Sequence, residues 1–134
     1  MHTFAIDGVE HVIDCNAFTP FIYAENFTTT RNGKTVPEDI NAAVDEVMQF
    51  SQEHSLPPML KLLQLFWAFE KTANSKVPGF RSWLRGLPKS CLSLTSEGGW
   101  AQAVMEEIDV CFFPDATGKD MASEGAGEPS SPAS

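Results

Sequence analysis

The sequence predicts an α+β domain that is mainly α-helical, with an N-terminal β-hairpin packed on a bundle of about five short helices. Three observations support this fold class. A tight-turn dipeptide, Asp7-Gly8, separates two short segments rich in β-branched and aromatic residues. Much of the remaining chain has apolar residues at helical spacing, interrupted by Pro and Gly. All aromatic residues lie within residues 1–113, so we expect one globular domain there and a disordered, acidic, low-complexity tail over residues 114–134.

The hairpin is expected within the first thirteen residues. Asp-Gly is favoured in two-residue type I′ turns because both central positions need a positive φ. The turn sets the register, and the face that packs on the helices then carries three cross-strand pairs: Ile6–Val9, Phe4–His11 and His2–Ile13.

A first helix is expected over residues 16–26, or from Thr19, because Thr19-Pro20 is typical of an N-cap followed by proline. One side of this helix is expected to carry Phe18, Phe21, Ile22 and Glu25, with Tyr23 beside them. Residues 28–34 are β-branched and turn-rich, which indicates a surface loop with a tight turn at Asn32-Gly33.

A second helix is expected over residues 37–53. Thr35 and Glu38 have the spacing of a capping box, and Pro37 would lie in the first helical turn. The apolar positions of this segment recur at helical spacing opposite acidic ones, so the helix is expected to be amphipathic.

Three more helices are expected over residues 59–72, 80–87 and from Ser96-Glu97 to about Cys111. The first of them is apolar nearly all round, which is typical of a central core helix or of a helix with one side docked on a partner. The last is expected to bury Trp100, Val104 and Ile108.

The charge of the chain excludes several classes of function. The net charge is −9, and Arg81, Arg85 and Lys89 are the nearest approach to a basic group. A nucleic-acid or anionic-lipid surface needs a positive footprint, so neither partner is expected. The most apolar stretch, residues 59–69, is too short to span a membrane. Three widely spaced cysteines without a CxxC pair favour free thiols in a reducing cytoplasm.

No motif for nucleophilic, phosphate-binding or metal chemistry is present, so we expect no enzyme activity, no metal and no cofactor. The histidines have no ligand spacing, and the adjacent acids Glu106-Glu107 are typical of a solvated face. The tryptophans are expected to fill the core, with Trp83 the best candidate for an exposed one. The candidate partner-binding residues are Phe80, Trp83 and Trp67, because aromatic side chains anchor interfaces.

The order of segments resembles a known family. A short hairpin, FAIDGVEHVIDCNAF, precedes an aromatic helix with FIYAENF, an acidic amphipathic helix, the hydrophobic helix LLQLFWAFEKTAN and a small FRSWLRGL element. This pattern is similar to the tail assembly chaperones of long-tailed (siphovirus-type) bacteriophages and prophages. The resemblance covers residues 1–113 and is one of segment order and aromatic placement.

The resemblance implies a function and partners. Such a protein binds the phage tape measure protein, keeps it soluble and helps to recruit the major tail (tube) protein. It acts in the cytoplasm of the bacterial host and is absent from mature virions. Many members exist in two lengths made by programmed ribosomal frameshifting, and the codons of Gly118 and Lys119 are a candidate frameshift position.

Two other functions remain open. One is an acidic phage-encoded inhibitor that mimics nucleic acid, although the acidic residues here are dispersed rather than gathered in one segment. The other is a structural head–tail or tail component that stays in the virion.

Overall fold

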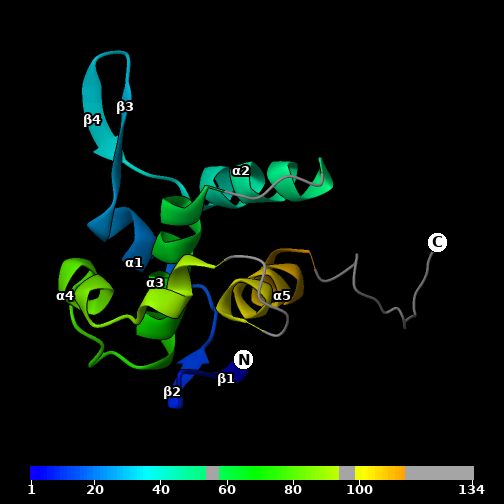
Figure 1. The fold of residues 1–134 in the computed structure, drawn as a ribbon. Coiled ribbons are helices and arrows are strands. Elements are labelled where there is room, and N and C mark those ends of the chain that lie inside the picture. Colours follow the sequence, from blue (N-terminus) through cyan, green and yellow to red (C-terminus); the bar gives the residue numbers. More distant parts are fainter. Residues whose placement is uncertain (54–57, 94–98, 114–134) are drawn as a thin grey trace.

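The computed structural model describes residues 1–53, 58–93 and 99–113 (Figure 1). It confirms an α+β, mainly α-helical fold with an N-terminal antiparallel hairpin. The described elements are β1 (His2–Ile6), β2 (Val9–Ile13), α1 (Thr19–Asn26), β3 (Thr28–Arg31), β4 (Lys34–Pro37), α2 (Ile40–Gln52), α3 (Met59–Ala73), α4 (Phe80–Arg85), the 3-10 helix η1 (Lys89–Leu92) and α5 (Trp100–Phe112).

The β1–β2 hairpin has the predicted turn and register. Asp7 and Gly8 have φ values of 49° and 82°, and the cross-strand partners are Ile6–Val9, Phe4–His11 and His2–Ile13. The inward face buries Ile6 and Ile13 and leaves Val9 exposed. The hairpin packs through β2 on α3 and through β1 on α5, which stabilises a pair of strands that would be marginal alone.

The prediction of a surface loop over residues 28–34 is wrong, because these residues form most of a second hairpin, β3–β4. The predicted tight turn is confirmed, with φ values of 52° at Asn32 and 76° at Gly33. We call residues 28–37 the β3–β4 arm, because the two strands extend away from the helices (Figure 1). Its strands contain β-branched residues but no alternating apolar face, which is why the usual strand signal is missing.

The predicted capping box is also wrong. Thr35 and Pro37 belong to β4, and α2 begins only at Ile40. The backbone N–H of Asn41 donates to the carboxylate of Asp39 over 3.0 Å, so Asp39 satisfies a free donor at this helix start. The rest of α2 behaves as predicted and buries Ile40, Ala43, Val44 and Val47.

Helix α1 begins at Thr19, as the proline predicts, but its buried side differs from the predicted one. Phe18 and Phe21 are 58% and 56% exposed, whereas Ile22 and Tyr23 are buried. A hydrogen-bonded pair of hydroxyls, Thr19 Oγ1 and Thr72 Oγ1 at 2.8 Å, turns the Thr19 side of α1 towards α3. The phenylalanines consequently face away from the core and contact each other, with ring centroids 5.3 Å apart.

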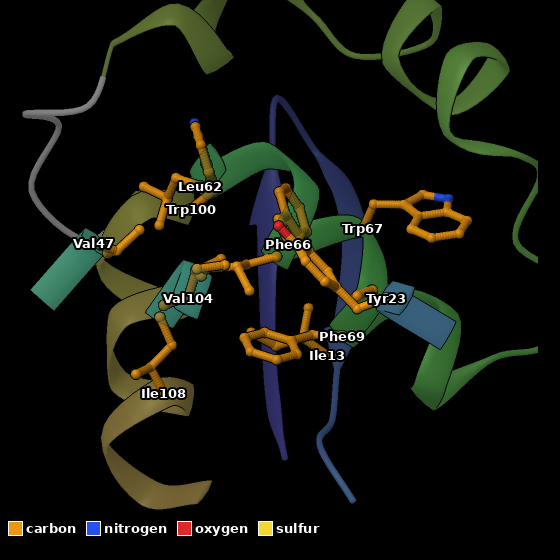
Figure 2. Packing of buried hydrophobic residues seen from close by; sticks show 14 of the residues in the cluster. Ile13, Tyr23, Val47, Leu62, Phe66, Trp67, Phe69, Trp100, Val104 and Ile108 are labelled. Carbon is orange, nitrogen blue, oxygen red and sulfur yellow. The ribbon is translucent and has the colours of Figure 1, made fainter. Parts of the chain in front are cut away.

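Helix α3 lies at the centre of the molecule, so the prediction of a central core helix over residues 59–72 is confirmed. Elements α1, α2, α4, α5 and β2 all contact it. Figure 2 shows its side chains surrounded by residues from β2, α1, α2 and α5, including Ile13, Tyr23, Val47 and Val104. The fully buried residues of α3 are Leu62, Leu65, Phe66, Ala68 and Phe69, with Trp67 at 1% exposure.

The C-terminal elements complete the core. Helix α4 ends at Arg85, earlier than the predicted residue 87, and Gly86 follows it as the C-cap. Helix α5 buries Trp100, Val104 and Ile108 as predicted. The predicted start at Ser96-Glu97, the tail 114–134 and the candidate frameshift residues Gly118 and Lys119 lie outside the described residues.

Candidate functional site

A groove lies where the end of α1, the start of α3 and the start of α4 meet. Its volume is ≈ 420 Å³, and its apolar lining comes from Phe27, Leu60 and Phe80. Gln64 and Arg81 contribute polar groups to the same groove. We call it the α1–α3–α4 groove.

The apolar lining of the groove rests on a cluster of aromatic rings. The Phe80 ring centroid lies 5.0 Å from that of Phe27 and 6.0 Å from that of Trp67, both in edge-to-face arrangements, and 6.1 Å from that of Trp83. Such contacts fix ring orientation as well as burying apolar area. The Trp67 indole N–H donates to the Pro78 carbonyl over 2.9 Å, which ties α3 to the turn before α4. The floor of the groove therefore consists of closely packed aromatic rings.

Leu60 and Phe80 differ in exposure. Leu60 is 57% exposed at the second residue of α3, and Phe80 is half-buried at the first residue of α4. Sequence pattern alone places both on apolar helix faces. The groove arises because Val77-Pro78-Gly79 brings the start of α4 back beside α3. The backbone N–H of Trp83 donates to the Gly79 carbonyl over 2.9 Å, which closes the first turn of α4.

Two of the three predicted partner-binding residues are not on the surface. The prediction that Trp83 is exposed is wrong, because its exposed fraction is 6%, and Trp67 is also buried. Trp100 is buried as well, so all three tryptophans fill the core, as expected on average for this residue type. Phe80 alone of the three candidates lines the groove, and Trp67 and Trp83 support its ring from behind.

The polar neighbours of the groove are held in place by hydrogen bonds. The buried Tyr23 hydroxyl donates to Gln64 Oε1 over 3.1 Å, and the Asn26 amide donates to the Ile22 carbonyl over 2.8 Å. Burial, with a smaller contribution from Glu38, raises the pKa of Tyr23 well above its ordinary value. Tyr23 therefore stays neutral and serves to position Gln64.

Two clusters elsewhere contain residue types that catalyse reactions. In one, His2 Nδ1 lies 2.6 Å from Oε1 of Glu107, and the Cys111 thiol donates to Oε2 of the same carboxylate over 3.3 Å. The expectation of a solvated face at Glu106-Glu107 is half wrong, because Glu107 is fully buried. Glu107 lies three residues after Val104 on the apolar stripe of α5, and this spacing is the signal that could have revealed its burial.

Cys15 adjoins this cluster, because its backbone carbonyl accepts from the Cys111 thiol over 3.7 Å. Both thiols are poorly suited to act as nucleophiles. Burial raises the pKa of Cys111 and of Cys15, and the neighbouring Glu107 carboxylate raises both further. Because the thiolate is the reactive form, a raised pKa lowers reactivity. Among residues 1–53, 58–93 and 99–113, no group of three or more His, Cys, Asp or Glu is arranged to hold a metal ion.

The second cluster joins the first hairpin to α3. His11 Nδ1 lies 2.9 Å from Glu70 Oε1, and both side chains are largely buried. The His11 ring stacks on Phe4, with centroids 5.9 Å apart, and its edge meets Phe66 at 5.7 Å. This enclosure on both sides is typical of a structural contact between β2 and α3.

Comparisons with protein-family models, curated proteins and solved structures find no match to this chain. Within the described part of the chain, no helix combines the length and apolar character needed to cross a bilayer.

Proposed function

We propose that this chain is a tail assembly chaperone of long-tailed bacteriophages or prophages. In this role it binds the tape measure protein, keeps it soluble and helps to recruit tail tube subunits, acting in the bacterial cytoplasm by protein–protein binding and without catalysis. The order of aromatic and helical segments over residues 1–113, which resembles that family, supports the proposal.

The observation that carries the proposal is the α1–α3–α4 groove, an open apolar surface on an otherwise acidic chain. An open apolar groove between helices fits the docking of an amphipathic helix. A long helical chain with an apolar stripe aggregates unless the stripe is covered, and a groove of this kind supplies such cover. The Phe80 ring packs edge to face on Phe27 and Trp67, and such packing before binding reduces the side-chain entropy lost on binding.

A second exposed apolar surface is consistent with the same role. Phe18 and Phe21 present two large rings to solvent at the start of α1. Paired exposed aromatic residues are typical of interaction sites, since most rings of this size are buried in a monomeric protein.

The test is co-expression with a tape measure protein, which the proposal expects to be encoded downstream of this gene. We expect the tape measure protein to be soluble with the full chain and to precipitate without it. Leu60→Asp should abolish the effect because it places a charge in the groove, whereas Leu92→Asp should not, since Leu92 is 68% exposed and does not line the groove. Equal precipitation with and without the wild-type chain would show the proposed function to be wrong.

Mass spectrometry of purified virions separates this function from a structural one. A chaperone should be absent from finished tails, whereas a head–tail or tail component should be present in stoichiometric amounts. A gel-shift competition with host nucleases addresses the nucleic-acid mimic, and inhibition there would overturn the chaperone proposal.

A further inference from the structure

The basic residues of this acidic chain are concentrated in one segment. None of the eighteen Asp and Glu lies between Glu70 and Glu97, but five of the nine Lys and Arg do: Lys71, Lys76, Arg81, Arg85 and Lys89. The start of α4, which forms one side of the groove, belongs to this segment. Arg81, one of these five residues, lines the groove, so the groove carries a positive charge on a molecule of net charge −9.

The cations of this segment differ in what they contact. Lys71 Nζ donates to the carbonyls of Ser75 and Val77, so it closes the turn after α3. Outside this segment, Lys61 on α3 is paired with Glu38. Arg81 and Arg85 are exposed and form no ion pair with any residue in the described ranges 1–53, 58–93 and 99–113. Their charges are therefore available to a partner.

We propose that the α1–α3–α4 groove binds an apolar helical segment of a partner protein that carries acidic residues beside its apolar stripe, with Arg81 and Arg85 pairing their carboxylates. The proposal deepens the proposed function by stating the chemistry of the partner segment. It rests on that function only for the partner's biological identity.

The spacing of the two arginines fits this partner. Arg81 and Arg85 are four residues apart, so they lie on the same side of α4, about one helical turn apart. Arg81 itself lines the groove. A guanidinium group can donate two parallel hydrogen bonds to one carboxylate. Acidic residues about one turn apart on a docked helix therefore match the spacing of Arg81 and Arg85.

The apolar part of the groove supplies the other half of the recognition. The groove has a volume of ≈ 420 Å³ and is open to solvent, so side chains from a docked helix can enter it. Leu60 projects from α3 with 57% exposure, and Phe80 faces it from α4. Burial of these side chains provides affinity, and Arg81 in the groove, with Arg85 one turn further along α4, selects the charge of what is bound.

Other occupants fit less well. A nucleic acid would meet only a few cations on a chain of net charge −9, and its phosphates would be repelled by the rest of the molecule. The segment 114–134 of this chain has acidic residues but contains Met121 as its only large apolar side chain, so it lacks an apolar stripe. A partner with both features is the occupant that the charges and the apolar lining favour together.

The experiment measures binding of two designed peptides to the full chain by fluorescence anisotropy. Each is a helix of about 16 residues, or four turns, with leucines at spacings of three and four. One carries glutamates beside the leucine stripe, and the other carries lysines at the same positions. We expect the glutamate peptide to bind at least about tenfold more tightly at low salt, and the difference to shrink as salt is raised.

Variants with matched controls locate the binding site. Arg81→Glu combined with Arg85→Glu should remove or reverse the preference for the glutamate peptide. Arg31→Glu combined with Lys34→Glu makes the same charge change on the β3–β4 arm and should preserve the preference. Leu60→Ser should weaken both peptides alike, whereas Leu92→Ser should weaken neither. Circular dichroism of each variant checks that the exposed substitutions leave the fold intact.

Several results would overturn the proposal: equal affinity for the two peptides, or an equal effect of the arm variant and the Arg81/Arg85 variant. Tighter binding of a single-stranded DNA oligonucleotide that is lost in the Arg81/Arg85 variant would assign these arginines to nucleic acid instead. Dissociation of self-associated chains by the glutamate peptide, seen by sedimentation, would assign the groove to a second copy. If the peptide preference holds but the tape measure protein stays insoluble with the wild-type chain, only the proposed function fails.

Discussion

Phe66 is the residue whose replacement tests the packing most directly. Its side chain is fully buried in the middle of α3, and four rings surround it. Ring centroids lie 4.9 Å away for Trp83, 5.4 Å for Trp100, 5.6 Å for Phe4 and 5.7 Å for His11. These rings belong to α4, α5, β1 and β2, so one side chain connects the hairpin to three helices. Phe66→Ala should therefore loosen the whole core.

The expected loss of stability follows from burial and from cavity formation. A buried aromatic side chain removes about 150–250 Å² from water, worth about 4–6 kcal/mol at ~25 cal/mol per Å². The methyl group of alanine retains part of this burial energy, and Phe→Ala substitutions in protein cores cost about 3–5 kcal/mol of stability. We expect about 4 kcal/mol here, because contacts on four sides limit how far the neighbours can collapse into the cavity. The free energy of unfolding of a small domain is about 5–15 kcal/mol, so the variant should still fold.

The assay is urea denaturation followed by far-ultraviolet circular dichroism, which does not depend on the tryptophans beside Phe66. With an m-value of about 2 kcal/mol per molar urea, the midpoint should fall by about 2 M. Phe18→Ala is the matched control, since Phe18 is 58% exposed and contacts one ring, and it should cost less than about 1 kcal/mol. Equal midpoint shifts for the two variants would refute the packing argument.

Three further predictions concern individual polar groups. Trp67→Phe should cost about 1 kcal/mol more than Trp83→Phe, because the indole N–H of Trp67 donates to the Pro78 carbonyl, whereas the buried indole N–H of Trp83 has no acceptor in the described part of the chain. Urea midpoints measure the difference, and equal costs would contradict it. Glu107→Gln should destabilise the fold by about 1–3 kcal/mol, because Glu107 is fully buried. Glu106→Gln should cost less than about 0.5 kcal/mol, because Glu106 is half exposed, and comparable losses would contradict the assigned burial. Burial, then the Glu106 carboxylate, raises the pKa of Asp109 above its ordinary value of 3.8, so the folded chain binds this proton more tightly than the unfolded chain. Stability should therefore fall as the pH rises from 3.8 through the raised pKa, and Asp109→Asn should remove this part of the pH dependence in thermal melts.

Local signals in the sequence are sufficient for much of the fold. The Asp7-Gly8 turn allows one hairpin register, so the pairing of β1 with β2 can be predicted residue by residue. Residues 59–72 are apolar on nearly all sides of the helix, and only a position surrounded by other elements buries such a helix. The sequence therefore identifies α3 as central.

The remaining features depend on contacts between distant segments. The side of α1 that is buried is selected by the Thr19–Thr72 hydroxyl pair, and no hydrophobic pattern within eight residues encodes it. The groove requires the start of α3 to lie beside the start of α4, a relation that the spacing of Leu60 and Phe80 in the sequence does not contain. For the same reason, the sequence identifies Phe80 as an aromatic candidate but not its exposed partner Leu60.

The β3–β4 arm has a further consequence for how this chain can vary. The Glu38 N–H donates to the Phe27 carbonyl over 2.9 Å, so the chain leaves and re-enters the body at adjacent points. When the ends of a loop are fixed, each doubling of its length raises the free energy of loop closure by only about 0.6 kcal/mol. The segment between Phe27 and Glu38 is therefore an insertion point, where an affinity tag or a whole foreign domain can be placed in the middle of the gene while α1 and α2 keep their positions.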